Sequence, residues 1–452
     1  MIGDIMYDLI VLGAGPGGYE AAAYAGAMGK KVALIEKEYI GGVCLNTGCI
    51  PTKTLLHSAK ILTVCKEAED YGIKTGKLGI DYRKILKRKK EVVSLLKKGV
   101  EGKLKRSGVE ILWGEGQLLS KDAVVVNGKS YKAKNILIAT GSRPAVPPIK
   151  GIDSSNVLDS TAILELGRIP KSLAVIGAGA IGLELACFFN EMGTNVKVIE
   201  MLPHIAYQMD TEITSYLLKS LEKKGIDFAL TSRVNTIGKK VISYMDENGK
   251  TKTSQSEIIL NATGRLPNLE NIGLDEINIL YDARGIKTDL QGKTSVPGIW
   301  ACGDITGRCL LAHAATREGI VAVNNMFGKK DVIRYKAIPN VIYTHPEVAS
   351  VGMTEQMLKQ EEIDYKKNIL HLNISGRFAA ENEKKQGYVK VLTGSRYHEI
   401  LGVHIIGGAA GEMIYGAATF IEMEMRAEDI KEIVFPHPTV SEAIKETICQ
   451  IK

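Results

Sequence analysis

The stretch Gly13-Ala14-Gly15-Pro16-Gly17-Gly18 decides the fold of the first part of the chain. It follows the apolar run Tyr7 to Leu12, which is typical of a buried strand, and it opens an alanine-rich segment that predicts a helix through Met28. Glycines at the spacing G-x-G-x-x-G between a strand and a helix are typical of a turn that holds the pyrophosphate of a dinucleotide. One copy is weak evidence, because glycine-rich turns also occur for packing alone.

The same plan recurs between residues 173 and 200. Leu173 to Ile176 is apolar, Gly177-Ala178-Gly179-Ala180-Ile181-Gly182 is the turn, and Leu183 to Met192 predicts the helix. In both copies an acid ends the strand that follows the helix, about 20 residues past the turn, where a carboxylate can accept hydrogen bonds from ribose hydroxyls. These acids are Glu36 and Glu200. Two complete copies predict two dinucleotide-binding units.

The three glycines of each turn are expected to have different tasks. The first allows the tight bend, the second lets a pyrophosphate approach the backbone, and the third lets the helix pack closely against the strand. In that order they are Gly13, Gly15 and Gly18 in the first turn, and Gly177, Gly179 and Gly182 in the second. The start of the helix then offers free N–H groups and the positive end of its dipole to the phosphates.

The residues after Glu200 indicate which nicotinamide cofactor the second site takes. An NADP site usually places an arginine there for the 2′-phosphate, whereas Glu200 is followed by Met201, Leu202 and Pro203. Because a carboxylate repels that phosphate, the sequence favours NAD.

Composition bounds the remaining possibilities. At about 150 residues per domain, 452 residues predict roughly three domains, and 45% hydrophobic with 24% charged residues is ordinary for a globular protein. A net charge of +7 is a weak argument for nucleic acid, so no nucleic-acid partner is expected. We find no secretory signal and no apolar run of about 20 residues for a membrane span. Seven cysteines, an odd number, favour a reducing compartment, so we expect a cytoplasmic protein.

The most basic stretch runs from Arg83 to Arg106. Its apolar residues recur near helical spacing, which predicts an amphipathic helix with a solvated charged face. A basic docking surface is the alternative interpretation.

The sharpest chemistry lies between the two turns, in Gly41-Gly42-Val43-Cys44-Leu45-Asn46-Thr47-Gly48-Cys49-Ile50-Pro51-Thr52-Lys53. In a regular helix, Cα atoms five residues apart lie roughly 8 to 9 Å apart, whereas a disulfide needs about 4.4 to 6.8 Å. A bridged pair therefore requires a distorted backbone, which Gly48 permits, and Pro51 fits a helix beginning near Cys49. We expect a dithiol switch whose thiolates the helix start stabilises. A structural zinc pair, or two unrelated thiols, are the alternatives.

This segment resembles the active-site signature of the FAD-dependent pyridine nucleotide–disulfide oxidoreductases, and within that family it is most similar to the enzymes that oxidise protein-bound dihydrolipoamide. The resemblance covers nearly the whole chain. Further matching segments occur in the family's order: Ala139-Thr140-Gly141-Ser142-Arg143-Pro144, Ala262-Thr263-Gly264-Arg265-Leu266-Pro267-Asn268, Gly303-Asp304, His345-Pro346-Glu347-Val348-Ala349-Ser350-Val351-Gly352, and His437-Pro438-Thr439-Val440-Ser441-Glu442.

The resemblance implies a role for each residue of the redox segment. Cys49 would lie nearest the flavin and form the charge-transfer thiolate, and Cys44 would exchange with the substrate disulfide. Lys53 would lie near flavin N5, paired with Glu184 from the second dinucleotide helix.

The resemblance also assigns both cofactors. The first turn with Glu36 would hold the ADP part of FAD, and Asp304 would hydrogen-bond its ribityl chain. The second turn with Glu200 would hold NAD. Gly141 and Gly264, in two of the matching segments, are further expected cofactor contacts, and no metal is expected.

The C-terminal segment supplies an acid–base group. Thiol–disulfide exchange needs a side chain that takes and returns protons near neutral pH, and histidine is best matched to that task. His437 fits, and Glu442 could accept a hydrogen bond from its imidazole and fix the tautomer. A catalytic role is weaker for His313, and His345 is expected to be structural. A second redox pair at Cys302 and Cys309, which flank Asp304, is an alternative.

Together these features predict an α/β fold with two Rossmann-like dinucleotide-binding domains and a C-terminal α+β dimerisation domain. The expected boundaries are 1–143 with 270–335 for FAD, 144–269 for NAD and 336–452 for the interface domain. Strands are expected at Tyr388 to Leu392 and Leu401 to Ile406, and a helix at Glu412 to Met425. In the family the C-terminal histidine completes the neighbouring subunit's site, which implies a homodimer.

The expected reaction is oxidation of protein-bound dihydrolipoamide by NAD. The implied partner is a lipoyl domain of a 2-oxo acid dehydrogenase complex or of the glycine cleavage system. A glutathione reductase would need NADP-binding arginines, and a mercuric reductase a C-terminal vicinal cysteine pair, where only Cys449 is present. A flavin-bound redox sensor without turnover is the remaining alternative, and it would not need Cys44, His437 and Glu442 together.

Overall fold

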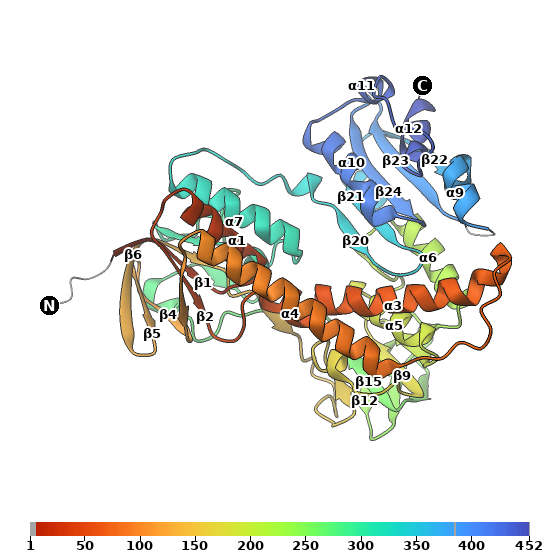
Figure 1. Cartoon of the computed structure of the whole chain (residues 1–452), viewed down its shortest axis with the longest axis horizontal. Helices are drawn as coiled ribbons and strands as arrows, with labels where there is room; N and C mark the ends of the chain where they lie inside the picture. Colours follow the sequence, from red (N-terminus) through yellow and green to blue (C-terminus); the bar gives the residue numbers. More distant parts are fainter. Residues whose placement is uncertain (1–5, 384–385, 452) are drawn as a thin grey trace. The chain divides into compact units, whose positions relative to one another are not determined.

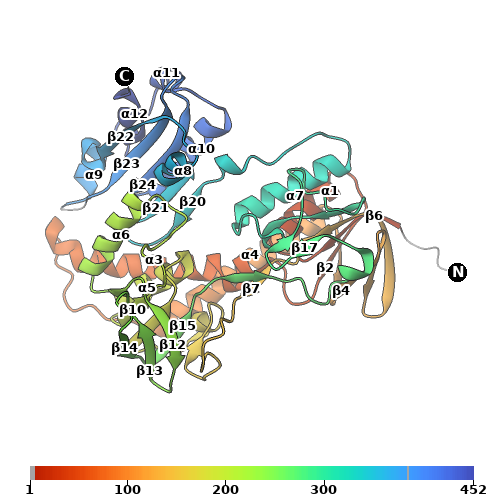
Figure 2. The same ribbon diagram turned by 180° about the vertical axis from the view of Figure 1, so that it is seen from behind.

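The computed structural model describes residues 6–383 and 386–451, which form two compact units. The first unit contains the described residues up to Thr54, then Leu86–Ala145 and Gly264–Ile333. The second contains Leu55–Ile85, Val146–Thr263 and the described residues from Arg334 onward. Figures 1 and 2 show the elements from opposite sides.

The first unit is built on one mixed sheet. Its spatial order is β3 (Glu110–Trp113), β2 (Val32–Glu36), β1 (Met6–Leu12), β6 (Lys129–Ile138), β5 (Ala123–Val126) and β4 (Gly116–Ser120), and β19 (Ile299–Ala301) also pairs with β6. The pairs β3–β2, β2–β1, β1–β6 and β6–β19 are parallel, whereas β4, β5 and β6 form an antiparallel meander. The apolar run in β1 is buried on both faces, as expected of a central parallel strand. Helices α1 (Pro16–Ala27) and α7 (Ala312–Met326) pack against each other.

The second unit repeats this plan in a parallel sheet of five strands. The order is β11 (Asp227–Ala229), β10 (Asn195–Ile199), β9 (Ser172–Ile176), β15 (Ile258–Asn261) and β8 (Val157–Leu158). As in the first sheet, the strand before the glycine turn is central and leads into a helix, here α5 (Ala180–Glu191). Helix α6 (Thr211–Lys223) follows β10. An antiparallel sheet of β12 (Arg233–Ile237), β13 (Val241–Met245) and β14 (Thr251–Gln255) completes this part.

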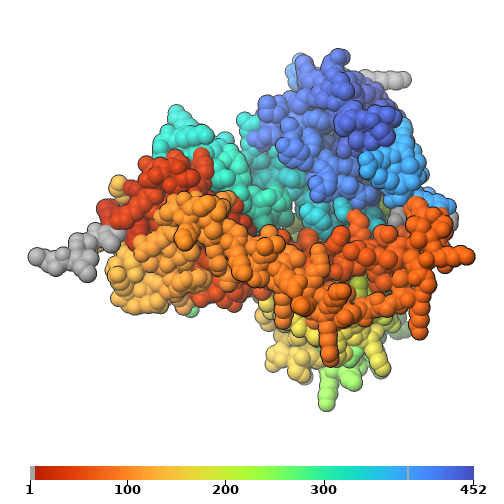
Figure 3. Space-filling model, viewed as in Figure 1, coloured from red at the N-terminus to blue at the C-terminus, as the bar shows by residue number. Residues whose placement is uncertain are grey.

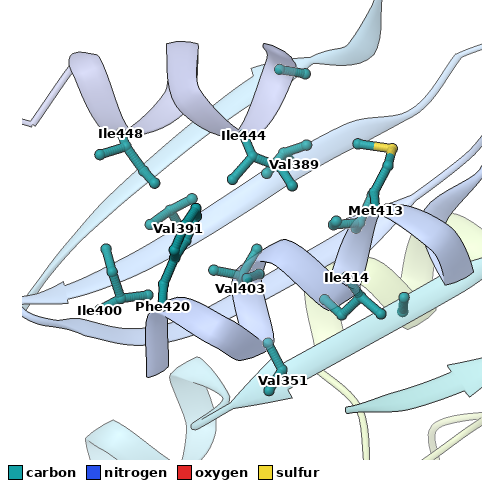
Figure 4. Close-up of a cluster of buried hydrophobic side chains, with 14 of the residues drawn as sticks. Val351, Val389, Val391, Ile400, Val403, Met413, Ile414, Phe420, Ile444 and Ile448 are labelled. Atoms are coloured by element: carbon teal, nitrogen blue, oxygen red, sulfur yellow. The ribbon is translucent and has the colours of Figure 1, made fainter. Parts of the chain in front are cut away.

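The C-terminal part of the second unit is an antiparallel sheet. Its order is β20 (Asn340–Ile342), β21 (Val348–Gly352), β24 (Ile400–Ile406), β23 (Tyr388–Gly394) and β22 (Tyr365–His371). Helices α10 (Ala410–Glu422) and α12 (Glu442–Cys449) contribute to a buried apolar cluster with this sheet, including Val391, Val403 and Ile444 (Figure 4). On the other face, Leu358 of α8 (Glu355–Gln360) packs against Leu392. Both strands and the helix expected here are present. Every residue of β23 is buried, because both faces are covered.

The remaining elements connect these sheets. They are α2 (Gly42–Thr47), α3 (Cys49–Glu67), α4 (Tyr82–Arg106), α9 (Gly376–Glu381), α11 (Ala427–Lys431) and the strand pairs β7–β16 (Ser142–Pro144 with Arg265–Pro267) and β17–β18 (Tyr281–Asp282 with Gly285–Ile286). The basic stretch forms α4, whose side chains are seen in orange in Figure 3. Most of its basic residues are exposed, but Lys89 is buried. The three-domain boundaries expected from the sequence stay a prediction.

The buried face of α12 should be important for the C-terminal sheet. Ile444 is fully enclosed, so Ile444→Ala is expected to cost about 2–5 kcal/mol through lost burial and a residual cavity. The thermal midpoint of the purified protein should fall by several degrees. Glu446→Ala, an exposed position on the same helix, is the control and should leave the midpoint unchanged. Equal midpoints for the two variants would contradict this packing.

Candidate active site

In both glycine turns, the first and third glycines are packed against neighbouring backbone, whereas the middle glycine faces open space. Gly13 has φ +99°, and a Cβ there would collide with the carbonyl oxygen of Ala139, while a Cβ on Gly18 would collide with that of Gly13. By contrast, a Cβ on Gly15 would meet nothing within 4 Å. Space beside the backbone is therefore left at the start of α1, where a pyrophosphate needs it.

The second turn has the same construction. Gly177 has φ +103° and faces the carbonyl oxygen of Ala262, and Gly182 packs on the carbonyl of Gly177. Gly179, the N-cap of α5, again has nothing within 4 Å of its Cβ position. The two turns thus match each other glycine by glycine, and both have room for a phosphate group.

An acid is tied to each turn. Glu36 Oε2 accepts a hydrogen bond of 2.8 Å from the backbone N–H of Ala14, and Glu200 Oε2 accepts one of 2.7 Å from Ala178. Glu200 Oε1 also accepts from the N–H of Leu202 at 2.8 Å. The carboxylates are thereby fixed beside the open glycines, so the residues present fit a dinucleotide with a free ribose hydroxyl pair at each turn.

The redox segment is attached to the first turn through its backbone. The N–H of Gly41 donates to the carbonyl of Ala14 at 2.9 Å, and a Cβ on Gly42 would touch the Cα of Gly15. Gly41 and Gly42 have φ of +96° and +58°, which favours glycine at both positions. The segment that carries the cysteines therefore starts beside the expected phosphate site.

The two cysteines lie on either side of a helix break. Cys44 is inside α2, Gly48 leaves the helical region with φ −142° and ψ −108°, and α3 begins at Cys49 as the sequence predicts. The N–H and the hydroxyl of Thr52 both donate to the carbonyl of Gly48. The distortion that a bridged pair requires is thus present at the expected glycine.

The Cys44 and Cys49 side chains are hydrogen-bonded, and this contact, followed by burial, raises the pKa of Cys44 far above that of an ordinary thiol. The positive charge of Lys53 acts in the opposite direction but does not win. The contact with Cys49 and burial therefore outweigh the charge of Lys53 at Cys44, and the expected stabilisation of the thiolates by the helix start stays a prediction. Only Cys49 lies at the N-terminus of α3, so Cys49 is the better placed of the two to carry a negative charge when the pair is reduced.

Asp304 is held by two residues that sequence reasoning did not single out. Ser142 donates its hydroxyl to Asp304 Oδ2 at 2.5 Å, and Arg265 donates from Nε to Ser142 Oγ at 2.7 Å and from Nη2 to the Ser142 carbonyl at 2.6 Å. Arg265 Nε also lies 3.8 Å from Asp304 Oδ2. Pairing of β7 with β16 brings these residues together. Gly141 and Gly264, with φ of +69° and +134°, lie just before these strands, and a Cβ on either would meet nothing within 4 Å.

Glu184 and Lys53 belong to different units, so their expected pairing stays a prediction. Glu184 is buried in α5, and its Oε1 accepts the backbone N–H of Tyr343 at 3.0 Å. Lys53 lies in the first unit with Cys44, whose ionisation it favours.

His437 and Glu442 form the predicted dyad. His437 Nδ1 lies 2.7 Å from Glu442 Oε1, and Glu442 Oε2 accepts the N–H of Thr439 at 2.7 Å. The Thr439 N–H and, next, the imidazole hold the pKa of Glu442 below its ordinary value. The carboxylate therefore stays charged and orients the ring, leaving Nε2 for proton transfer. The side chain of His437 is 78% exposed within the single chain.

The alternative sites are less suited to redox chemistry. Burial raises the pKa of both Cys302 and Cys309, the latter to about 12, so neither ionises near neutral pH. His345 precedes Pro346 in a cis peptide, and His313 lies at the start of α7. Among residues 6–383 and 386–451, no group of three or more histidine, cysteine or acidic side chains is placed to hold a metal ion.

Comparison with known proteins now gives the family. The model for "pyridine nucleotide-disulphide oxidoreductase" matches residues 7–319, and the model for the dimerisation domain of the same family matches residues 338–448. The chain belongs to the pyridine nucleotide–disulphide oxidoreductases. The resemblance seen in the sequence is confirmed, as are the α/β fold class and the enzyme class, and FAD and NAD are the cofactors of this family.

Members of the family align with this chain along nearly its full length. A dihydrolipoyl dehydrogenase of Geobacillus stearothermophilus is 40% identical, covering 99% of this chain and 97% of the relative. One of Cupriavidus necator is 39% identical over 97% of each chain. The solved structure of LpdA from Mycobacterium tuberculosis, 24% identical, superposes with a TM-score of 0.89 over 98% of this chain and 99% of that one, which shows the fold.

In the part of the chain that the structure describes, no helix has the length and apolarity to cross a membrane.

The two kinds of glycine in the NAD turn should be separable by mutation. Gly179→Ala places a methyl group where the cofactor is expected, at φ −77°, which alanine adopts freely. Gly182→Ala drives a Cβ into the Gly177 carbonyl. We expect Gly179→Ala to keep the thermal midpoint and weaken NADH binding by about tenfold or more, measured by fluorescence titration. Gly182→Ala should lose about 1–3 kcal/mol of stability. Native NADH affinity in Gly179→Ala would rule out a cofactor at this turn.

Proposed function

We propose that this chain is a dihydrolipoyl dehydrogenase, which oxidises protein-bound dihydrolipoamide and reduces NAD. The observation that carries this proposal is the hydrogen-bonded Cys44–Cys49 pair, placed at the break between α2 and α3 and attached to the first glycine turn. Relatives of 36–40% identity over nearly the whole chain bear that name. The NAD preference rests on Glu200, whose carboxylate is held at the second turn and would repel a 2′-phosphate.

The chain's own residues perform a disulfide exchange. With Cys44 and Cys49 oxidised, a substrate thiolate attacks Cys44 Sγ, and Cys49 leaves as a thiolate at the N-terminus of α3. The second substrate thiol gives up its proton and attacks the mixed disulfide, which closes the lipoyl ring and expels Cys44 as a thiolate. That thiolate takes up a proton, because the contact with Cys49 and burial raise the pKa of Cys44. Bound FAD supplies the two-electron acceptor that restores the disulfide, and NAD is the final acceptor.

His437 serves both proton transfers. Glu442 holds its Nδ1, so Nε2 can take a proton from the substrate dithiol and return it to the leaving sulfur. The imidazole lies almost fully in solvent within one chain, which suits a group that acts in a neighbouring subunit. A homodimer built through the dimerisation domain at 338–448 is therefore the proposed working unit.

The proposed macromolecular partner is a lipoyl domain of a 2-oxo acid dehydrogenase complex or of the glycine cleavage system. The cytoplasm is the proposed location, since a dithiol switch together with five other free cysteines favours a reducing compartment.

The substrate assignment is tested by comparing disulfide acceptors. The purified, FAD-loaded protein is assayed with NADH or NADPH against lipoamide, glutathione disulfide and mercuric ion. We expect turnover with NADH and lipoamide only. Brisk turnover of glutathione disulfide with indifference to lipoamide would assign a different disulfide reductase, and absence of all turnover would favour a redox sensor.

The dyad is tested by removing one member at a time. His437→Gln should keep the flavin spectrum and slow lipoamide turnover by roughly 10²- to 10⁴-fold, as typical of acid–base catalysis. Glu442→Gln should also slow turnover, because the charge that orients the ring is lost. The control is Glu446→Gln, on the exposed side of the same helix, which should behave as the parent. Parental rates in His437→Gln would remove the histidine from the mechanism.

The homodimer is tested by mixing two inactive variants. Cys49→Ser lacks the dithiol but keeps the histidine, and His437→Gln has the reverse defect. After subunit exchange, a hybrid dimer contains one site with both groups if His437 acts across the interface. Activity should therefore reappear on mixing, toward a quarter of the parental value per total chain. No recovery after demonstrated exchange would place His437 in its own subunit's site.

A further inference from the structure

A row of polar side chains crosses the middle of the C-terminal sheet. Ser350, His404 and Lys390 lie directly opposite one another on β21, β24 and β23. His404 Nδ1 lies 3.0 Å from Ser350 Oγ and its Nε2 lies 3.0 Å from the carbonyl of Met353, and the ring is fully buried. The opposite face of these strands carries the apolar cluster of Figure 4. A lysine in such a place requires compensation, because burial of an unpaired charge is costly.

Three carboxylates compensate Lys390. Its Nζ lies 2.9 and 3.0 Å from the two oxygens of Asp210, 2.9 Å from Glu212 Oε2 and 2.6 Å from Glu355 Oε2. Lys390 is 1% exposed, and the Asp210 side chain is fully buried. Burial would lower the pKa of Lys390, but the three acceptors raise it above its ordinary value, so the lysine stays charged.

Asp210 joins the C-terminal sheet to the dinucleotide-binding part of the same unit. It is the N-cap of α6, where its Oδ1 accepts the N–H of Glu212 at 3.1 Å, and its Oδ2 accepts the N–H of Glu355 at 3.1 Å. Gln356 adds a hydrogen bond of 3.3 Å from Nε2 to the carbonyl of Met209. Helices α6 and α8 and strands β23 and β24 are labelled in Figure 2. The start of α6 is therefore held by Lys390 of the C-terminal sheet and by Glu355 and Gln356 of α8.

The segment before Asp210 is the loop that orients the NAD-site acid. Residues 201–209 connect Glu200 to Asp210. Near the start of this loop, the Leu202 N–H donates to Glu200 Oε1. In its middle, the Ala206 N–H donates to the carbonyl of Ala178 in the glycine turn at 2.8 Å. Ala206 is left-handed with φ +47°, a conformation that alanine holds only when its surroundings impose it.

We propose that Lys390 is a positioning residue for NAD: by clamping Asp210, it holds the 201–209 loop so that Glu200 faces the ribose. The inference rests on the proposed NAD site at the second glycine turn. It makes nicotinamide-cofactor affinity depend on a side chain of the dimerisation domain that does not contact the cofactor. Release of the clamp loosens the end of the 201–209 loop. Leu202 is then held through its carbonyl, which accepts the N–H of Thr231 at 3.1 Å, and its own N–H orients Glu200 less firmly.

A purely structural role is the alternative, because a buried ion pair can often be replaced by apolar side chains without loss of stability. The two roles differ in their readout. A structural lysine changes the thermal midpoint or both Michaelis constants together, whereas a positioning lysine changes NAD affinity alone. A loosened Glu200 also discriminates less against a 2′-phosphate.

The test uses the FAD-loaded full-length protein with NADH and NADPH as probes. Lys390→Met should raise the Kd for NADH and the KM for NAD by about tenfold, and the ratio of the NADPH Kd to the NADH Kd should fall. The KM for lipoamide, the flavin spectrum and kcat at saturating NAD should stay within about twofold of the parent. Because NADH binding is measured without lipoamide, failure of the substrate assignment would leave this test intact.

Two further variants keep the test decisive. Lys367→Met is the matched control, since Lys367 contacts Glu212 and Glu355 from an exposed position, and it should leave NADH affinity unchanged. Asp210→Asn leaves Lys390 compensated by Glu212 and Glu355, so it serves if Lys390→Met does not fold, and it should weaken NADH binding in the same way. Native NADH affinity in a folded Lys390→Met or Asp210→Asn protein would overturn the proposal. So would an equal rise of the lipoamide and NAD Michaelis constants.

Discussion

The close packing of one glycine on the carbonyl of another is the constraint on which both cofactor sites depend. Gly18 lies on Gly13 and Gly182 lies on Gly177, so each helix begins hard against its strand. That contact aims the N-terminus of the helix at the space beside the second glycine, where a Cβ would have no atom within 4 Å. A side chain at the third glycine would push the helix away and misdirect the N–H groups.

The segment that carries the two cysteines is connected to the first glycine turn through backbone contacts. Gly41 and Gly42 rest on Ala14 and Gly15, and the cysteines follow within one short helix and one break. Their position therefore does not depend on side-chain packing alone. The separation of roles also follows from local structure. Cys49 starts a helix and is placed to carry negative charge, whereas Cys44 lies within a helix, is partly buried and has a raised pKa because of its contact with Cys49.

The sequence predicts what is encoded by short-range spacing. Both glycine turns, the helix start at Cys49 and the contact between His437 and Glu442 follow from residues within a few positions of each other, and the structure has all of them. Contacts between segments that are far apart in the sequence cannot be predicted in this way. Ser142 and Arg265, more than 120 residues apart, meet at Asp304 only because β7 pairs with β16.

The burial of Lys390 could not be predicted for a different reason, because the alternation of apolar and polar residues in β23 predicts that its polar face is exposed. The helices that cover both faces come from separate parts of the chain, and no local pattern indicates that a lysine there will be enclosed.

The first turn differs from the second in one residue that changes its mechanics. Pro16 occupies the first position of α1, where Ala180 stands in α5. Proline fixes φ and has no N–H, so the first turn offers one donor fewer but loses less chain entropy when a ligand is bound. The same backbone arrangement is thereby used twice with different stiffness. The first turn is more rigid, which suits a cofactor that stays bound, and the second is more adaptable, which suits a cofactor that must dissociate after every turnover.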